Sequence, residues 1–134
     1  MRGFALPRLP RAALALLAVP LLGISCPSSE PLCPQPEPPF AVRARFFDGP
    51  SNTLLTGPTP GELQDGAYRD SLRADGYNGD GLVTTMAAGQ GRTGTYRLTA
   101  KRDGYAAYAQ SGLRVRSEGC LFGTITLEVQ LQPE

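Results

Sequence analysis

The sequence contains no histidine and no tryptophan. Histidine is the usual general base of enzymes and a common ligand of metals. Its absence excludes Ser-His-Asp and Cys-His catalytic sites, together with most zinc and non-haem iron centres. Without tryptophan, a sugar-binding module would have to stack its ligand on Tyr77 or Tyr108. We therefore predict that the chain is not an enzyme and that it holds no cofactor and no metal.

Basic side chains are scarce beyond the N-terminus. Three of the 13 Lys and Arg residues lie in the first 25 residues, whereas all 12 acidic residues come later. The later part therefore has a net charge of −2 and no basic run, which gives no reason to expect nucleic-acid binding. The apolar stretch 12–24 has 13 residues, fewer than the roughly 20 that a membrane-spanning helix needs.

The N-terminal residues follow the order of a signal peptide. Arg2, Arg8 and Arg11 precede the apolar stretch, and small residues then lead to Cys26. A cleavage site directly before a cysteine resembles the bacterial lipobox, in which that cysteine carries a diacylglycerol on its sulfur and a third acyl chain on its amine. We predict that residues 1–25 are removed and that Cys26 is lipidated, which would anchor the protein to a membrane of the cell envelope. The alternative is ordinary secretion as a soluble protein, because Gly23 stands where a lipobox has Leu.

The sequence has three cysteines, an odd number for an exported chain. If Cys26 carries lipid, Cys33 and Cys120 remain as a pair in an oxidising compartment. A disulfide between them would close a loop of about 88 residues and stabilise the fold by about 4 to 5 kcal/mol at most. The pairing of Cys26 with Cys33 stays open as an alternative.

Residues 26–39 form a proline-rich linker that begins at the candidate lipidation site. Six of the 13 residues from 27 to 39 are proline, which excludes a helix or a sheet ladder. We expect an extended polyproline II spacer of roughly 40 Å between the anchor and the folded domain, residues 40–134.

The folded domain shows short runs of alternating apolar and polar residues separated by Gly, Pro and Asp, and no helical periodicity. The clearest run is 124–131, in which Ile125, Leu127, Val129 and Leu131 alternate with polar residues. We predict an all-β sandwich of about seven short antiparallel strands, because a single sheet would leave one apolar face exposed. Candidate strands are 40–46, 54–56, 62–65, 68–72, 82–87, 95–101, 113–116 and 124–131. Asp103-Gly104 predicts a type I′ hairpin after which Tyr105 begins the returning strand.

Several short motifs together resemble the bacterial carboxypeptidase regulatory-like domains, which have a transthyretin-like β-sandwich. The matching pieces are Phe46-Phe47-Asp48-Gly49, Asp65-Gly66-Ala67-Tyr68, Gly94-Thr95-Tyr96-Arg97-Leu98, Asp103-Gly104-Tyr105, Gly112-Leu113-Arg114-Val115 and Cys120 leading into the last strand. The resemblance implies an accessory or binding module at the cell surface with no catalytic residues. Enzymes with transthyretin-like folds depend on histidines that this chain lacks.

Two glycine-rich motifs invite a stronger interpretation. Residues 89–94 match G-x-G-x-x-G, but a strand follows where a dinucleotide site needs a helix, so we expect a flexible hairpin loop. Residues 75–81 are similar to a calcium loop, but a register starting at Gly76 leaves ligand positions 1 and 12 to Gly76 and Ala87. A turn is therefore expected there, with weak calcium binding as the alternative.

A binding surface is expected where the sandwich is least constrained. Residues 74–94 contain six glycines and only one short apolar stretch, which predicts a long loop at one end. The candidate contact residues are Tyr77, Asn78, Asp80 and Arg92. A competing surface is a wet face carrying Arg43, Arg45, Arg97, Arg114 and Arg116, which we interpret as a solvated face that deters aggregation.

The sequence thus predicts a non-catalytic binding or structural module of the bacterial cell envelope, held by a lipid anchor and partnered by an envelope protein or glycan. The alternative is a secreted enzyme or a sugar-binding or metal-binding module that uses Asp, Glu, Ser and Tyr side chains.

Overall fold

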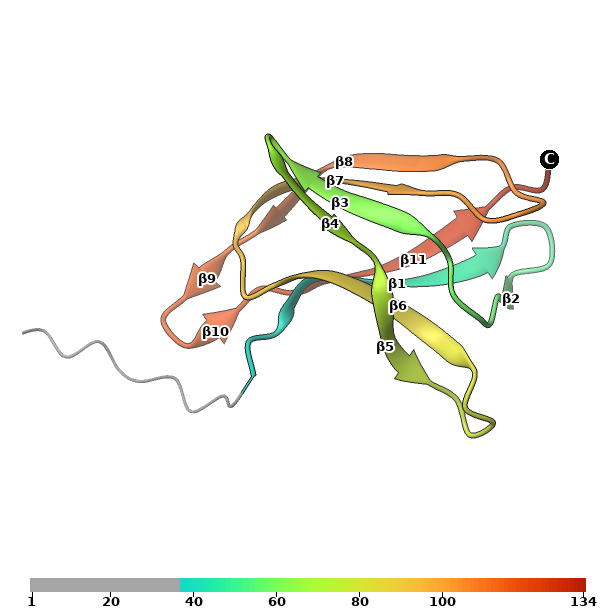
Figure 1. Ribbon diagram of the computed structural model, residues 1–134, viewed down its shortest axis with the longest axis horizontal. Coiled ribbons are helices and arrows are strands. Elements are labelled where there is room, and N and C mark those ends of the chain that lie inside the picture. Colours follow the sequence, from blue (N-terminus) through green and yellow to red (C-terminus); the bar gives the residue numbers. More distant parts are fainter. Residues whose placement is uncertain (1–36) are drawn as a thin grey trace, which may run out of the picture.

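The computed structural model describes residues 37–134, which form two packed β-sheets (Figure 1). Sheet A has the strand order β11-β1-β6-β5, with β2 added to β1, and sheet B has the order β4-β3-β7-β8. Strands β9 and β10 form a separate small hairpin. The described residues contain no helix, so none of them offers a helical membrane span. The predicted all-β sandwich is confirmed, with eleven strands in place of about seven.

The strands are short, as the spacing of turn residues predicts. Their bounds are β1 Phe40–Asp48, β2 Thr53–Leu54, β3 Gly61–Asp65, β4 Tyr68–Ser71, β5 Arg73–Tyr77, β6 Val83–Gln90, β7 Gly94–Ala100, β8 Tyr108–Val115, β9 Ser117–Glu118, β10 Leu121–Phe122 and β11 Ile125–Leu131.

Strand β1 lies inside sheet A, between β11 and β6. Its alternating residues Val42, Ala44 and Phe46 are buried in the core, as predicted. The β1–β11 pair is parallel, with Ala44 opposite Leu127, whereas the sequence predicts only antiparallel pairs. Parallel partners need a long crossover connection, and here the chain passes through both sheets before β11 returns beside β1.

Strand β7 provides the inner face of sheet B. Tyr96, Leu98 and Ala100 are buried and the intervening residues face outward, which confirms the predicted alternation. Leu98 lies opposite Leu63 of β3, so these two leucines pack side by side toward sheet A. The register between β7 and β8 shifts between Tyr96 and Leu98, on the stretch of β8 where Gly112 has a φ of +75°.

Three local predictions for the turns are wrong. Residues 74–94 do not form a long loop, because β5 and β6 fill most of this range as a hairpin. Residues 89–94 do not form a hairpin loop either, since they carry the chain from sheet A to sheet B. The Asp103-Gly104 turn exists, but it is not of type I′, because among the described non-glycine residues only Asn52 has a positive φ. Tyr105 then bridges to Pro133, and β8 starts at Tyr108.

Candidate binding surface at the β5–β6 hairpin tip

The hairpin of β5 and β6 projects from one end of sheet A (Figure 1). Its tip, residues 77–82, exposes two large apolar side chains. Tyr77 is 61% exposed and Leu82 is 47% exposed, and the hydrophobic core contains neither of them. Such side chains contribute little to folding when they lie in water, and tyrosine is enriched in protein contact surfaces.

The tip is held in one shape by its own hydrogen bonds. The side-chain oxygen of Asn78 accepts from the backbone N–H groups of Asp80, at 3.0 Å, and Leu82, at 2.9 Å. The Asn78 N–H in turn donates to the carbonyl of Leu82 at 2.9 Å. A short polar side chain that bonds to nearby backbone in this way is a turn-forming device. The exposed Tyr77 and Leu82 are therefore presented by an ordered turn.

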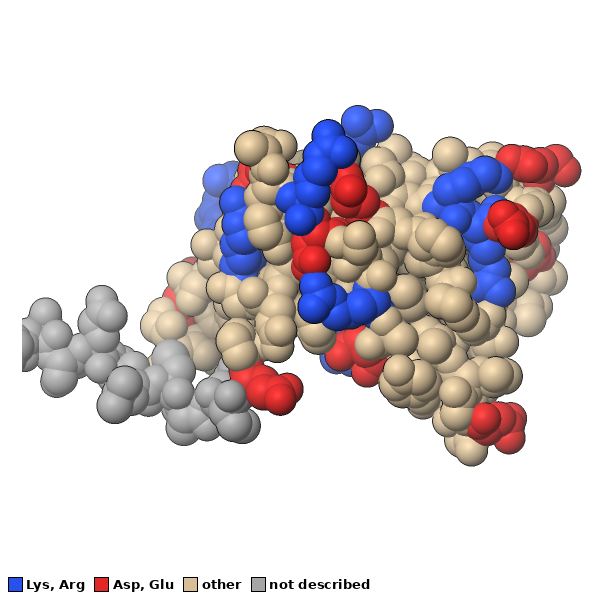
Figure 2. Space-filling view, in the orientation of Figure 1, with Lys and Arg blue, Asp and Glu red and all other residues tan. Residues whose placement is uncertain are grey.

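The surface of the tip is nearly uncharged. Asp80 carries its only carboxylate, and no ion pair holds this group within residues 37–134. Figure 2 shows the hairpin as a mostly uncharged projection with acidic atoms at its end. This combination of apolar side chains with one carboxylate resembles the composition of a small protein-contact patch more than that of a catalytic site.

The fourth predicted contact residue, Arg92, lies elsewhere. It belongs to the turn between β6 and β7, so the eight residues of β6 separate it from the tip by about 25 Å. The structure therefore brings Tyr77, Asn78 and Asp80 together and leaves Arg92 apart from them.

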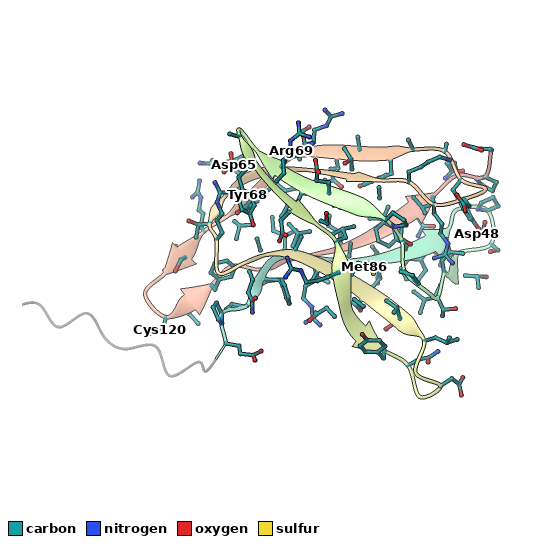
Figure 3. The ribbon with its side chains drawn as sticks, in the orientation of Figure 1. Asp48, Asp65, Tyr68, Arg69, Met86 and Cys120 are labelled. Atoms are coloured by element: carbon teal, nitrogen blue, oxygen red, sulfur yellow. The ribbon has the colours of Figure 1, made fainter. Side chains whose placement is uncertain are left out.

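Arg92 belongs to an interlocked group that we term the Arg92 cluster, comprising Asp65, Tyr68, Arg92 and Tyr96. Its guanidinium lies 3.8 Å from the centre of the Tyr68 ring, and its Nη1 is 3.1 Å from Oδ2 of Asp65. The buried Tyr96 hydroxyl donates to the carbonyl oxygen of Arg92 at 2.7 Å. Asp65 and Tyr68 are seen together at the end of the sandwich that also holds Cys120 (Figure 3). These contacts fix the turn that joins the sheets.

The ionisation of this cluster follows from the same contacts. The hydrogen bond to Tyr96 raises the pKa of the Arg92 guanidinium, and Asp65 adds to this effect. Burial raises the pKa of Tyr68, and the negative charge of Asp70 acts in the same direction. Arg92 therefore stays charged and Tyr68 stays neutral at ordinary pH, which suits a cation–π contact in a structural role.

Leu82 is the residue of the tip that the sequence interpretation missed. The run 82–87 predicts a strand that begins at Leu82, whereas β6 begins at Val83. The signal that could have found it is Asn78-Gly79, a dipeptide typical of hairpin turns, four residues before Leu82. In the observed turn Leu82 lies opposite Asn78, whose N–H donates to the Leu82 carbonyl, and Tyr77 lies opposite Val83.

The competing arginine surface is not one face, which corrects the prediction. Arg43 and Arg45 lie on sheet A, where they pair with Asp75 at 2.7 Å and Glu128 at 3.8 Å. The other three arginines, Arg97, Arg114 and Arg116, belong to sheet B or follow it directly, and no ion pair engages them in the described part of the chain. Alternation within each strand is readable from sequence, but the sheet to which a strand belongs is not.

The structure also places the other motifs. The calcium-like residues form the β5–β6 hairpin, in which the Asn78 oxygen is already occupied by backbone donors. A strand follows the G-x-G-x-x-G motif at Gly94, as the sequence indicates. Among residues 37–134, no three Cys, Asp or Glu side chains gather as metal ligands.

Tyr108 is partly buried, which raises its pKa, and its hydroxyl bonds to Gln110, so it offers a poor stacking platform for a sugar.

Of the predicted lipidation and disulfide sites, the structure describes only Cys120. The signal peptide, Cys26 and Cys33 lie outside the described residues. Cys120 lies in the turn of the β9–β10 hairpin, partly buried, and lines a cavity of about 230 Å³ together with Pro38 and Pro39. The segment entering the fold therefore passes beside Cys120.

No family model, no curated protein and no solved structure matches the chain. Its function must therefore be argued from its own residues.

Proposed function

We propose that the chain is an exported, lipid-anchored, non-catalytic β-sandwich that acts as a binding module of the bacterial cell envelope. The β5–β6 hairpin tip is its contact surface for an envelope protein or glycan. The observation that carries this proposal is the pair of exposed apolar side chains, Tyr77 and Leu82, on a turn closed by Asn78. Burial of such a pair against a partner would supply contact area at low conformational cost, because the turn is already ordered.

A binding role accords with the chemistry of the chain better than catalysis does. The sequence has no histidine, and the acidic residues with resolved contacts serve turns or ion pairs. Asp48 is an example, since Ser51 donates to its carboxylate from the backbone and from the hydroxyl, which lowers its pKa. A carboxylate held in its charged form is a weak general base.

The lipid anchor rests on the order of residues in the leader and is tested by labelling. Cells expressing the full chain are grown with labelled palmitate, and we expect incorporation into the wild type and its loss in Cys26→Ser. The variant should move from the membrane fraction to the soluble fraction. Soluble wild-type protein without label would contradict the anchor and favour ordinary secretion.

We also propose a disulfide between Cys33 and Cys120. The position of Cys120 beside Pro38 and Pro39 supports it, because Cys33 precedes Pro38 by only five residues. Peptide maps of protein from its native compartment, with and without reduction, should contain a linked Cys33–Cys120 peptide. A linked Cys26–Cys33 peptide would instead favour the alternative pairing and exclude lipid on Cys26.

The contact surface is tested with Tyr77→Ser/Leu82→Ser. Cross-linking and pull-down from a detergent extract of the envelope should identify partners of the wild type that the double variant loses. The control is Arg97→Ser, which changes an exposed side chain of sheet B away from the hairpin tip. Both variants should melt like the wild type. If the double variant retains all partners, protein and glycan alike, the tip is not the contact surface.

A further inference from the structure

The folded domain begins at the end of the sandwich opposite the hairpin tip. The carbonyl of Pro39 accepts a hydrogen bond from Gly91 N–H at 2.8 Å, and Pro38 packs on the same glycine. Gly91 has a φ of +68°, and an added Cβ there would lie 2.8 Å from the Cβ of Pro38. The incoming chain is thus fixed against the β6–β7 turn. We term this turn and the β9–β10 hairpin, which lie at the same end of the sandwich, the leader end (Figure 1).

The leader end exposes an apolar side chain that does not pack against the hydrophobic core. Leu121 at the start of β10 is 76% exposed, more than either Tyr77 or Leu82. The next residue, Phe122, packs against the core, so the hairpin is seated while Leu121 points outward. A leucine in this position gains free energy only if something apolar covers it.

Two cationic side chains lie in the segment that leads into the β9–β10 hairpin, in which Glu118 is the residue opposite Leu121. Arg114 and Arg116 line an open groove of about 480 Å³, together with the hydroxyl-bearing residues Thr93, Thr95 and Ser117. Neither arginine has an ion-pair partner in residues 37–134, although Glu118 lines the same groove and offsets part of their charge. Guanidinium and hydroxyl groups together suit the phosphate oxygens of lipid headgroups.

We propose that the leader end docks on the membrane that holds the anchor, with Leu121 in the interfacial layer and Arg114 and Arg116 beside lipid phosphates. This inference rests on the proposed lipid anchor. The leader from Cys26 to Pro36 has eleven residues, so it would reach about 35 Å if extended. The proposed disulfide would shorten the free part to seven residues, about 22 Å. The leader end is therefore the part of the domain held closest to the bilayer.

A weak contact is sufficient in this arrangement. One leucine and two arginines, partly offset by Glu118, would not hold a free protein on a bilayer, but a short tether gives the contact a high effective concentration. The docked orientation directs the β5–β6 hairpin tip away from the lipid, toward the rest of the envelope. The two ends of the sandwich then have separate tasks.

The absence of tryptophan makes the orientation measurable. Leu121→Trp and Leu82→Trp each place a single tryptophan in the acylated mature protein, at opposite ends. In vesicles containing phosphatidylglycerol, we expect the emission of Leu121→Trp to shift to shorter wavelength and to be quenched by brominated acyl chains. Leu82→Trp should keep the emission of an exposed indole. Equal, water-like emission from both variants would overturn the inference.

The charge contribution is tested in the Leu121→Trp background. Arg114→Gln/Arg116→Gln should reduce quenching by brominated lipid, whereas Arg43→Gln/Arg45→Gln, which removes the same charge from sheet A, should not. Equal effects of the two pairs would exclude a specific role for the groove. Palmitate labelling of the same preparations separates the two proposals. Labelled Leu121→Trp protein whose indole stays in water refutes only the docking, whereas unlabelled protein refutes the anchor itself.

Discussion

The leader end and the hairpin tip hold their turns by different means. At the leader end, the Arg92 cluster fixes the β6–β7 turn through a buried tyrosine, a stacked guanidinium and an ion pair. At the tip, one carboxamide and the backbone close the turn, and Tyr77 and Leu82 stay in solvent. Charged and aromatic side chains of the Arg92 cluster thus stabilise the fold, whereas Tyr77 and Leu82 at the tip remain available for contacts.

This contrast separates stability from binding. A substitution in the Arg92 cluster should lower the free energy of unfolding, because its side chains are engaged internally. A substitution at the tip should leave the melting temperature nearly unchanged. The same residue type can therefore have opposite importance at the two ends, and tyrosine offers the direct comparison.

The largest effect is expected from Tyr96→Ala. Tyr96 is 1% exposed, and its loss leaves a cavity between the sheets, so the free energy of unfolding should fall by about 3 to 5 kcal/mol. Tyr77→Ala should change it by less than about 0.5 kcal/mol, because that side chain lies in solvent. Urea denaturation followed by circular dichroism measures both.

Tyr96→Phe keeps the comparison testable if Tyr96→Ala does not fold. It removes only the hydroxyl that donates to the Arg92 carbonyl, which should cost about 1 to 2 kcal/mol. Tyr77→Phe is the matched control and should melt like the wild type. Equal losses at the two positions would show that the tip is as much a part of the folding unit as the cluster.

A smaller effect is expected from Arg92→Gln. This change removes the ion pair with Asp65 and the stacking on Tyr68, and it should lower the melting temperature by less than Tyr96→Ala does. Arg97→Gln is the control, since no ion pair engages Arg97 in the described residues, and it should melt like the wild type. High salt should weaken only part of the Arg92 contribution, because stacking is not screened like an exposed ion pair. A melting temperature unchanged by Arg92→Gln would contradict the structural role of the cluster.

Sequence periodicity predicted the strands whose inner residues are apolar. Apolar residues at alternate positions predict strands β1, β7 and β11, and the structure buries such residues, among them Val42, Leu98 and Val129. Strand β5 was missed because it contains Arg73, Asp75 and Gly76 and pairs at the edge of sheet A, where backbone bonds to β6 hold it. A strand that is held mainly by backbone hydrogen bonds to its neighbour needs little alternation of apolar and polar residues in its own sequence.

The candidate site was predictable only in part. Tyr77, Asn78 and Asp80 are close in sequence, and turn chemistry brought them together. The glycine-rich range 74–94 is expected to include a long loop that holds Arg92 with them, but β6 carries Arg92 to the other end. Its contacts to Asp65 and Tyr68 depend on how β3 and β4 pack, which local sequence does not encode.

Asp48 provides a pH-dependent test at a third turn. Ser51 donates to its carboxylate, which lowers its pKa below the ordinary value of 3.8. The charged form is thus favoured by folding, and this stabilisation is present above about pH 4 and is lost as the pH falls through the lower folded pKa. Asp48→Asn should melt below the wild type at neutral pH, and the difference should shrink toward about pH 2.

Thermal melts of wild type and Asp48→Asn over this pH range measure the effect. Asp80→Asn is the control from the hairpin tip, because no ion pair holds that carboxylate in the described residues. It should melt like the wild type at neutral pH. If the difference in melting temperature between Asp48→Asn and the wild type does not vary with pH, Asp48 stabilises the turn by its hydrogen-bond geometry and not by its charge.

The smallest global effect is expected from Asn78→Ala. Its side-chain oxygen accepts from the Asp80 and Leu82 amides, so its removal should free both amides to exchange with solvent. Hydrogen exchange should become faster at these two positions while the amides of β6 and β7 stay protected and the melting temperature stays close to the wild-type value. Because partner binding requires an ordered tip, Asn78→Ala should also weaken the pull-down even though Tyr77 and Leu82 remain. Faster exchange that spreads into β6 would show that the tip is coupled to the core, and the contrast between the two ends would then fail.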